Sequence, residues 1–212
     1  TPLVHVTGTW DAWLAGKSSN FRGRARRLER KLVREHALTF RLTERPEDVQ
    51  ADLDAVIRLH EARWAHDGVP TGAFAGARRA FHHDVARRAL HNGSLRLWVA
   101  EVDECPIAAY YGFRAGGSEW YYQLGRDPAW NAASIGFVLL THVLRSAFED
   151  GLRCFRFGLG GEDYKDRFAD ADPGLHTAVL AAGIVNATTV AAARGLRRLP
   201  ERARRPLLSR AG

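Results

Sequence analysis

Residues 119–137, EWYYQLGRDPAWNAASIGF, join a strand-like pattern to a helix-like pattern through a run of small residues. Glu119–Leu124 is rich in aromatic residues and predicts a strand, and the apolar residues after Ser134 recur at helical spacing. The turn between them ends in Asn131-Ala132-Ala133-Ser134-Ile135-Gly136. A strand that leads through small residues into a helix is a ready anion site, because free backbone N–H groups and the positive helix end both face the ligand. This junction therefore predicts a site for the diphosphate of a cofactor.

The sequence before this stretch extends the pattern into a sheet. Leu95–Val102 and Ile107–Phe113 are apolar runs separated by a tight turn, and Ala115-Gly116-Gly117 leads into the strand at Glu119–Leu124. Such short connections favour antiparallel pairing between consecutive strands. Residues 95–124 therefore predict an antiparallel meander of three strands.

The sequence after the stretch predicts a crossover. Helix 134–150 is followed by a strand at Arg153–Phe157 and by a polar, Gly-rich loop at residues 158–165. Strands joined by a helix usually lie parallel to each other. We therefore expect an α/β (α+β) fold with a mixed sheet, in which an antiparallel meander and a parallel crossover strand are flanked by helices.

Upstream of the meander, apolar periodicity predicts further helices and one more strand. The helices are expected at residues 9–14, 20–34, 46–64 and 76–91, and the strand at residues 37–43. We expect three parts: an N-terminal basic helical segment at 1–36, a main domain at 37–183, and an Arg-rich tail at 184–212. Leu175–Ala182 is the candidate for a last strand of the main domain.

The net charge of +7 is unevenly distributed, because cations gather in residues 17–34 and 194–212. Basic ends of this kind suit tRNA phosphates, an anionic membrane or an acidic partner, and they also suit a solvated helix face with a frayed tail. No apolar run approaches the ~20 residues of a membrane span, and the two cysteines give no disulfide framework. We expect a cytoplasmic protein, with a peripheral membrane contact left open. The absence of Met favours a piece of a longer chain.

Several motifs, taken in order, carry a resemblance to a known family. They are Ser19-Asn20-Phe21-Arg22, Arg63-Trp64, Phe81, Pro106-Ile107-Ala108, residues 121–128 (YYQLGRDP), Ser134-Ile135-Gly136 and residues 163–168 (DYKDRF). Over residues 10–170 the chain resembles the GNAT-like acyltransferases of cellulose and exopolysaccharide biosynthesis, the CelD/BcsL-like family, which is related to the Fem aminoacyltransferases. The resemblance implies a GNAT-like fold, acetyl-CoA or another acyl-CoA as co-substrate, and no metal. It also implies a first GNAT-like half upstream of this chain.

The resemblance and the anion-site argument point to the same donor-binding residues. Backbone N–H groups at the helix start would hold phosphate, Gly136 would allow close approach, and the exposed edge of the preceding strand would hold the pantetheine arm. The residues expected to bind the donor are Tyr122, Gln123, Leu124, Arg126, Ser134, Ile135 and Gly136. An ordinary capped helix packed on a strand remains the alternative interpretation.

The candidates for the chemistry follow the Gly-rich turn. Asp163, Tyr164 and Lys165 would supply acid–base groups: Lys165 would stabilise an oxyanion or an anionic donor, and Tyr164 would protonate the leaving group. A surface loop whose charges pair locally is the alternative. Candidate acceptor contacts, which packing would also explain, are Arg63, Trp64, Glu119 and Trp120. No set of His, Cys and carboxylate residues has the spacing of a zinc site.

Three functions remain open at this point. The first is an N-acyltransferase that moves an acyl group from acyl-CoA to an amine of a small molecule or sugar. The second takes aminoacyl-tRNA as the donor, with residues 17–34 as the tRNA surface, and its binding would weaken steeply with salt. The third is a non-catalytic GNAT-like module that docks on a membrane-associated polysaccharide synthase, with residues 194–212 at an anionic bilayer.

Overall fold

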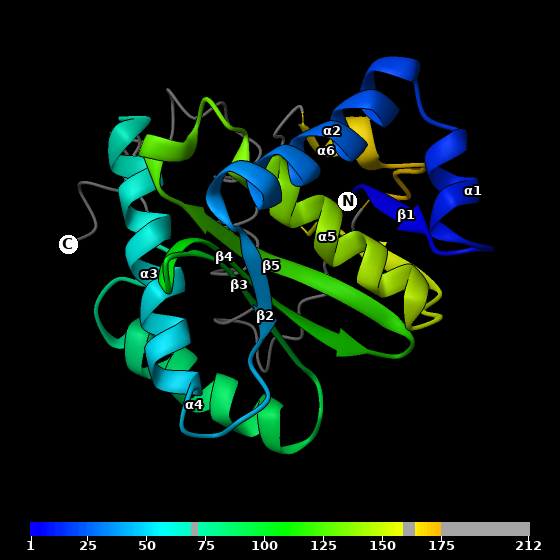
Figure 1. The fold of residues 1–212 in the computed structure, drawn as a ribbon. Helices are drawn as coiled ribbons and strands as arrows, with labels where there is room; N and C mark the ends of the chain where they lie inside the picture. Colours follow the sequence, from blue (N-terminus) through cyan, green and yellow to red (C-terminus); the bar gives the residue numbers. More distant parts are fainter. Residues whose placement is uncertain (69–71, 159–163, 175–212) are drawn as a thin grey trace, which may run out of the picture. The chain divides into compact units, whose positions relative to one another are not determined.

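The sheet of the computed structural model has six strands in the order β1-β6-β5-β4-β3-β2 (Figure 1). The structure describes residues 1–68, 72–158 and 164–174. The strands are β1 (Leu3–His5), β2 (Thr39–Leu42), β3 (Leu95–Val102), β4 (Cys105–Ala115), β5 (Ser118–Arg126) and β6 (Cys154–Arg156). The helices are α1 (Trp10–Ala15), α2 (Ser19–His36), α3 (Val49–His66), α4 (Ala77–His91), α5 (Ile135–Glu149) and α6 (Tyr164–Phe168), with a 3-10 turn η1 at Pro128–Trp130.

The predicted mixed sheet is confirmed. β3, β4 and β5 form an antiparallel meander, and β6 pairs with β5 in parallel after the α5 crossover. Two-residue turns join the meander strands, and both residues of each turn have positive φ: Asp103 and Glu104 in the first, Gly116 and Gly117 in the second. Positive φ matches the right-handed twist of the paired strands, which fixes their register.

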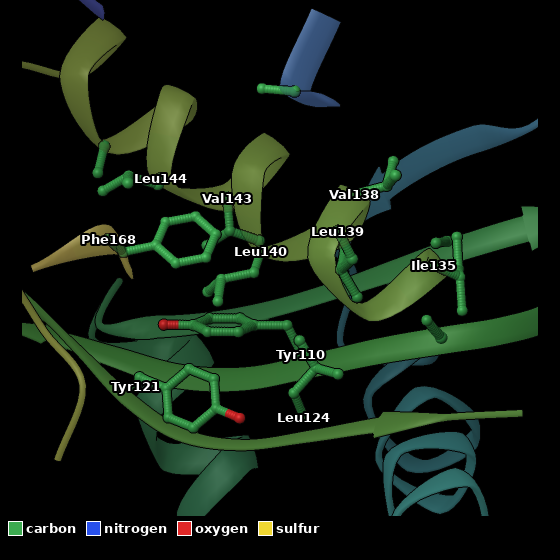
Figure 2. Packing of buried hydrophobic residues seen from close by; sticks show 14 of the residues in the cluster. Tyr110, Tyr121, Leu124, Ile135, Val138, Leu139, Leu140, Val143, Leu144 and Phe168 are labelled. Carbon is green, nitrogen blue, oxygen red and sulfur yellow. The ribbon is translucent and has the colours of Figure 1, made fainter. Parts of the chain in front are cut away.

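Helices cover both faces of the sheet. α1, α2 and α5 share one hydrophobic cluster with the sheet, and α3 and α4 share a second cluster on the other face (Figure 1). Leu139 and Leu140 of α5 lie over Tyr110 and Leu124 of the sheet, as Figure 2 shows. Gly125 lets α3 cross β5 closely, because a Cβ at this position would overlap the backbone of Leu59 and His60. This crossing brings the C-terminal end of α3 to the end of β5.

The N-terminal basic helix is tied into the core. Ser18 caps α2 by accepting a hydrogen bond from the Phe21 amide at 3.2 Å. Phe21, Ala25 and Leu32 are buried in the same cluster as α5. Residues 1–173 form one compact unit, and the domain boundary expected at residue 183 lies outside the described residues.

Two local expectations are wrong, and one strand was not expected. Leu3–His5 forms a strand that the sequence does not reveal, because three residues are too few for a periodic pattern and pairing with β6 stabilises them. Phe81 falls on the apolar face predicted for the helix at 76–91, but it is 61% exposed, because α4 instead turns His82, Ala86 and Ala89 inward. Tyr164 and Lys165, expected at the end of the loop 158–165, form the first turn of α6. The candidate strand Leu175–Ala182 and the Arg-rich tail lie outside the described residues.

Candidate active site

The parallel pair of β5 and β6 ends early and leaves a gap in the sheet. Their register runs from Ser118↔Cys154 to Trp120↔Arg156. β5 continues along β4 to Arg126, so Tyr121–Arg126 has no ladder partner on the β6 side within the described chain. Backbone N–H and C=O groups on such an open edge can bind an extended ligand.

A cleft of about 450 Å³ lies at this gap. It is bounded by the end of β5, the first turns of α5, and side chains from α2, α3 and α6. Its lining residues are Arg24, Arg63, Tyr121, Leu124, Arg126, Asn131, Ser134, Gly136, Phe137, Leu140, Tyr164, Arg167 and Phe168. The cleft has the volume of a small-molecule site.

The N-terminus of α5 opens into this cleft. Ser134 precedes the helix with φ 57° and ψ 40°, a left-handed conformation that is uncommon for residues other than glycine. Its amide donates to Asn131 O at 2.9 Å, so this N–H is already used. The amides of Ile135 and Gly136 have no acceptor among the described residues, and Gly136 lines the cleft. One unpaired N–H at a positive helix end therefore faces the cleft directly.

Gly136 keeps the approach to this N–H open. A Cβ at position 136 would lie 3.2 Å from Cδ of Arg126 and 3.5 Å from Cδ2 of Leu124. The space in front of the helix end would therefore be narrowed by any side chain. A diphosphate fits this arrangement, because it binds to backbone N–H groups that no side chain covers and to positive charge.

The cleft is cationic. Arg24, Arg63, Arg126 and Arg167 line it, and no carboxylate does so in the described chain. Burial, and next the Arg63 cation, lower the pKa of Arg126. Asp67 is the nearby counterion, but it lies 3.9 Å from both Arg63 and Arg126. Among the described residues the positive charge of the cleft is thus incompletely balanced, which favours an anionic ligand.

Two phenols line the cleft, and a buried lysine lies near one of them. Tyr164 Oη donates to Tyr121 Oη at 3.2 Å, and both side chains line the cleft. Lys165 is only 1% exposed, and its Nζ lies 6.0 Å from the centre of the Tyr121 ring. The sequence places Lys165 at the end of a loop, with a surface position as the alternative, and the structure places it in α6 with its side chain buried.

The structure brings together about half of the residues predicted from sequence. The predicted residues that line the cleft are Arg63, Leu124, Arg126, Ser134, Gly136 and Tyr164. The side chain of Ile135 is buried in the core, and the side chains of Tyr122 and Gln123 do not line the cleft. Tyr122 and Gln123 nevertheless belong to the open strand edge for which they were predicted. Asp163 lies outside the described residues.

Three other candidates lie elsewhere. Glu119 is fully buried beneath the C-terminal end of α5, where Arg114 bonds it at 2.9 Å and also pairs with Asp150. Trp120 is 42% exposed and stacks under Arg156. Trp64 donates its indole N–H to His60 Nε2 at 2.9 Å on the α3 side of the sheet. None of these three lines the cleft.

Sequence reasoning missed Arg24 and Arg167. Arg24 was grouped with the other cations of residues 17–34, and only its position on the inward side of α2 separates it from them. Arg24 donates to Ser134 Oγ at 3.0 Å and covers the Phe137 ring at 4.4 Å. One signal was present: Arg24 precedes the buried Ala25 and follows Phe21 by one helical turn.

The comparison with protein families agrees with this geometry. Residues 19–166 match the family model described as an acetyltransferase (GNAT) domain. The chain belongs to the GNAT acetyltransferase family. Acyltransferases are the enzyme class of this family, and the six-stranded sheet with its gap beside β5 is consistent with the GNAT fold. Among curated proteins, no match was found.

Solved structures of low sequence identity share this GNAT fold. FemX superposes with a TM-score of 0.60 at 10% identity, over 77% of this chain and 53% of FemX. An aminoglycoside acetyltransferase from an uncultured soil metagenomic sample, solved with sisomicin, has a TM-score of 0.50 at 15% identity, over 71% of this chain and 99% of that one. A GCN5-related N-acetyltransferase from Ralstonia eutropha has a TM-score of 0.50 at 19% identity, over 69% and 99%. The chain spans about half the length of FemX.

Two further observations bear on metal and membrane. Within residues 1–68, 72–158 and 164–174, no cluster of His, Cys, Asp or Glu has the arrangement of a metal site. In the same part of the chain, no helix combines the length and apolarity that crossing a membrane requires.

Proposed function

We propose that this GNAT protein is an N-acyltransferase that transfers an acyl group directly from acyl-CoA to an amine of a small molecule or sugar. The observation that carries the proposal is the cationic cleft at the gap between β5 and β6, closed at one end by the N-terminus of α5. In this cleft, a helix end suited to phosphate and an open strand edge suited to an extended arm lie next to each other.

The phosphate end of the donor would lie against α5. The Gly136 amide, the helix dipole and the guanidinium groups of Arg24 and Arg126 supply donors and positive charge there. Asn131 holds Arg126 by accepting from its Nε at 2.7 Å, which pre-orients that guanidinium. Fixed donors of this kind bind at a smaller entropic cost than mobile side chains do.

The pantetheine end would lie along β5. The open edge at Tyr121–Arg126 offers backbone groups for an amide-bearing arm, as an added strand would use them. One carbonyl of this edge is occupied, since Arg63 Nη1 donates to Leu124 O at 3.4 Å. The arm would then end beside Tyr121 and Tyr164.

At that end, Tyr164 is the proposed proton donor to the leaving thiolate. Its hydroxyl lies in the cleft wall and donates a hydrogen bond to Tyr121, which holds the phenol in place. Lys165, buried beside Tyr121, is proposed to favour negative charge that develops on the thioester oxygen. Positioning supplies the larger share of rate in such direct transfers.

The proposal is tested by calorimetry with acetyl-CoA at two salt concentrations, followed by thiol release with a panel of amines and amino sugars. We expect saturable binding of acetyl-CoA that changes little with salt. Absence of binding by the chain at either salt concentration would refute the donor assignment. A longer protein with an upstream half, if that half contributes to the acceptor site, would show higher turnover with the same donor affinity.

An aminoacyl-tRNA donor is the second candidate, because one observation favours it. The outward face of α2 carries a row of exposed cations: Arg26, Arg27, Arg30, Lys31 and Arg34. Several of them pair locally, as Lys31 and Arg34 do with Glu35. Binding of tRNA that weakens by orders of magnitude between low and moderate salt would support this candidate. The membrane-docking function rests on residues 194–212, which lie outside the described chain.

A further inference from the structure

A second cavity, of about 450 Å³, adjoins the cleft. Arg24, Phe137 and Arg167 line both spaces, so the cleft and the second cavity share one wall. The other lining residues of the second cavity come from the start of α2 and the turn before it, and they are Lys17, Ser18, Asn20 and Phe21. Within the described chain no residue of β5 lines it. The second cavity therefore continues the cleft away from the sheet edge.

The apolar part of the second cavity is aromatic. The buried Phe21 ring meets the Phe137 ring edge-on, with 5.4 Å between the ring centres, and α6 holds Phe21 in place through a contact of 5.0 Å with Phe168. The guanidinium of Arg24 covers the Phe137 ring at 4.4 Å. Nucleic-acid bases stack on aromatic rings and on guanidinium planes of this kind. The wall therefore suits a flat base.

The unbalanced positive charge of the second cavity comes from two arginines. Within the described chain, Arg24 donates only to the neutral hydroxyl of Ser134, at 3.0 Å. Arg167 is exposed and has neither a hydrogen bond nor an ion pair with a described residue. Lys17, the third cation, is already held by Asp170 at 2.8 Å and by the Phe168 carbonyl oxygen at 2.6 Å. Arg24 and Arg167 are thus the cations left for an anionic ligand.

We propose that the second cavity binds the adenosine of CoA and that Arg167 binds its 3′-phosphate. This inference rests on the acyltransferase function proposed above. It identifies the class of donor as a free CoA thioester, rather than an acyl group on the phosphopantetheine arm of a carrier protein, because only the former brings a phosphorylated nucleoside.

The order of the parts of CoA agrees with the order of the spaces. The pantetheine arm would lie along β5 and the diphosphate at the Gly136 amide, so the nucleoside must leave the diphosphate on the side away from β5. Phe137, the next residue of α5, belongs to the wall that the two spaces share. A nucleoside that leaves the diphosphate at this wall enters the second cavity directly.

The chemistry of the 3′-phosphate agrees with a guanidinium partner. A phosphate monoester carries a charge of about −1.5 to −2 at pH 7. A guanidinium can bind it through two parallel hydrogen bonds, which fixes the orientation as well as the charge. Arg167 is suited to this role because no described carboxylate competes for it.

The test compares CoA with 3′-dephospho-CoA, which differ only in this phosphate, by calorimetry at one fixed salt concentration. The proteins are the wild type, Arg167→Gln and Arg27→Gln. Arg27→Gln is the matched control, because it removes the same charge from an exposed position of α2 that lines neither space. Arg24 is unsuitable as the test residue, since it also faces the proposed diphosphate position. Thermal unfolding accompanies every variant.

We expect the wild type to bind CoA about tenfold more tightly than 3′-dephospho-CoA, the lower range for hydrogen bonds to a charged group. Arg167→Gln should lose about tenfold in affinity for CoA and should bind 3′-dephospho-CoA within about twofold of the wild type. The retained binding of 3′-dephospho-CoA also shows that the variant is folded. Arg27→Gln should keep the wild-type preference.

Equal affinity of the wild type for the two ligands would overturn this inference alone and leave the proposed function intact. A full preference for CoA in Arg167→Gln would also overturn it, because the 3′-phosphate would then bind elsewhere. The same is true of equal losses in Arg167→Gln and Arg27→Gln, which would indicate a general charge effect. Absence of binding of both ligands by the wild type would refute the proposed function together with this inference, so the two failures are distinguishable.

Discussion

Arg24 of α2 donates a hydrogen bond of 3.0 Å to Oγ of Ser134, the residue that precedes α5. The two residues are 110 positions apart in the sequence. Ser134 is in the left-handed region, a conformation that costs of order 1 kcal/mol or more and needs support from its surroundings. The bond therefore ties the basic N-terminal helix to the strained start of the helix at which the donor phosphates are proposed to bind.

Replacing Arg24 should weaken donor binding. Arg24→Ala removes a cation from the cleft wall and the hydrogen bond to Ser134, and we expect affinity for acetyl-CoA to fall about tenfold, or about 1.4 kcal/mol. Arg27→Ala is the control, since Arg27 is exposed on the same helix and does not line the cleft. Equal losses in both variants, measured by calorimetry, would indicate a general charge effect rather than a specific contact.

Gly136→Asp should separate donor binding from stability. A carboxylate in the first turn of α5 interacts favourably with the helix dipole, so the melting temperature should stay equal or rise slightly. The same carboxylate would face the donor phosphates, and binding of acetyl-CoA should become undetectable. Gly136→Ala, whose Cβ lies 3.2 Å from Arg126 Cδ, should bind with intermediate affinity. Retained binding in Gly136→Asp would move the phosphate site elsewhere.

Tyr164→Phe should reduce turnover without loss of donor affinity. The change removes the proposed proton donor to the thiolate and leaves the ring in the cleft wall, so kcat should fall between about 10-fold and 100-fold. Thiols of low pKa leave without help from an acid. A donor with such a leaving group should therefore restore most of the rate in the variant, and no restoration would argue against the role in protonation.

Lys165 should be tested with a shape-conserving change, because the structure buries it. Lys165→Ala would leave a cavity, so a loss of activity in this variant could come from a less stable fold rather than from the missing ammonium group. Lys165→Met keeps most of the stem and removes the charge, and we expect a fall in kcat at unchanged affinity for acetyl-CoA. Thermal unfolding identifies any change in the fold. A Met variant with full activity would remove Lys165 from the mechanism.

His142 should make the protein sensitive to acid. Its ring stacks on Phe40 at 3.9 Å, and burial, followed by the Arg145 cation, lowers its pKa from 6.5 to about 4. As the pH falls, His142 is therefore protonated in the unfolded chain before it is protonated in the folded protein. The contribution of the neutral His142 ring to the free energy of unfolding is complete above pH 6.5 and is lost as the pH falls toward 4.

The variant His142→Phe keeps the stack and removes this proton. Urea unfolding between pH 7.5 and 4.5 should show a wild-type slope steeper by at most about 1.4 kcal/mol per pH unit. His60, whose pKa is also lowered to about 4 by burial, gives both proteins a common background slope. Parallel curves for the two proteins would show that His142 is not protonated on unfolding.

The local patterns of the sequence predicted the order of strands and helices in the centre of the chain. Alternation, short turns and the apolar helix 134–150 depend on neighbouring residues, so periodicity alone located β3, β4, β5 and α5. The parallel pairing of β6 with β5 followed from the helix that joins the two strands. The junction at Ser134 and Gly136 was recognised for the same reason, since small residues before a helix are a local signal.

The cleft itself depends on contacts between distant segments. Arg24, Arg126 and Arg167 come from three separate elements, and no periodicity distinguishes the arginine that faces inward from its exposed neighbours on α2. The burial of Lys165 and the pairing of Tyr122 with His82 likewise arise from packing against other elements. The sequence by itself determined the central strands of the sheet and the small-residue start of α5, because these depend on local backbone geometry. Only the tertiary structure decided which charges and phenols share the site, because their distances are set by the packing of helices onto the two faces of the sheet.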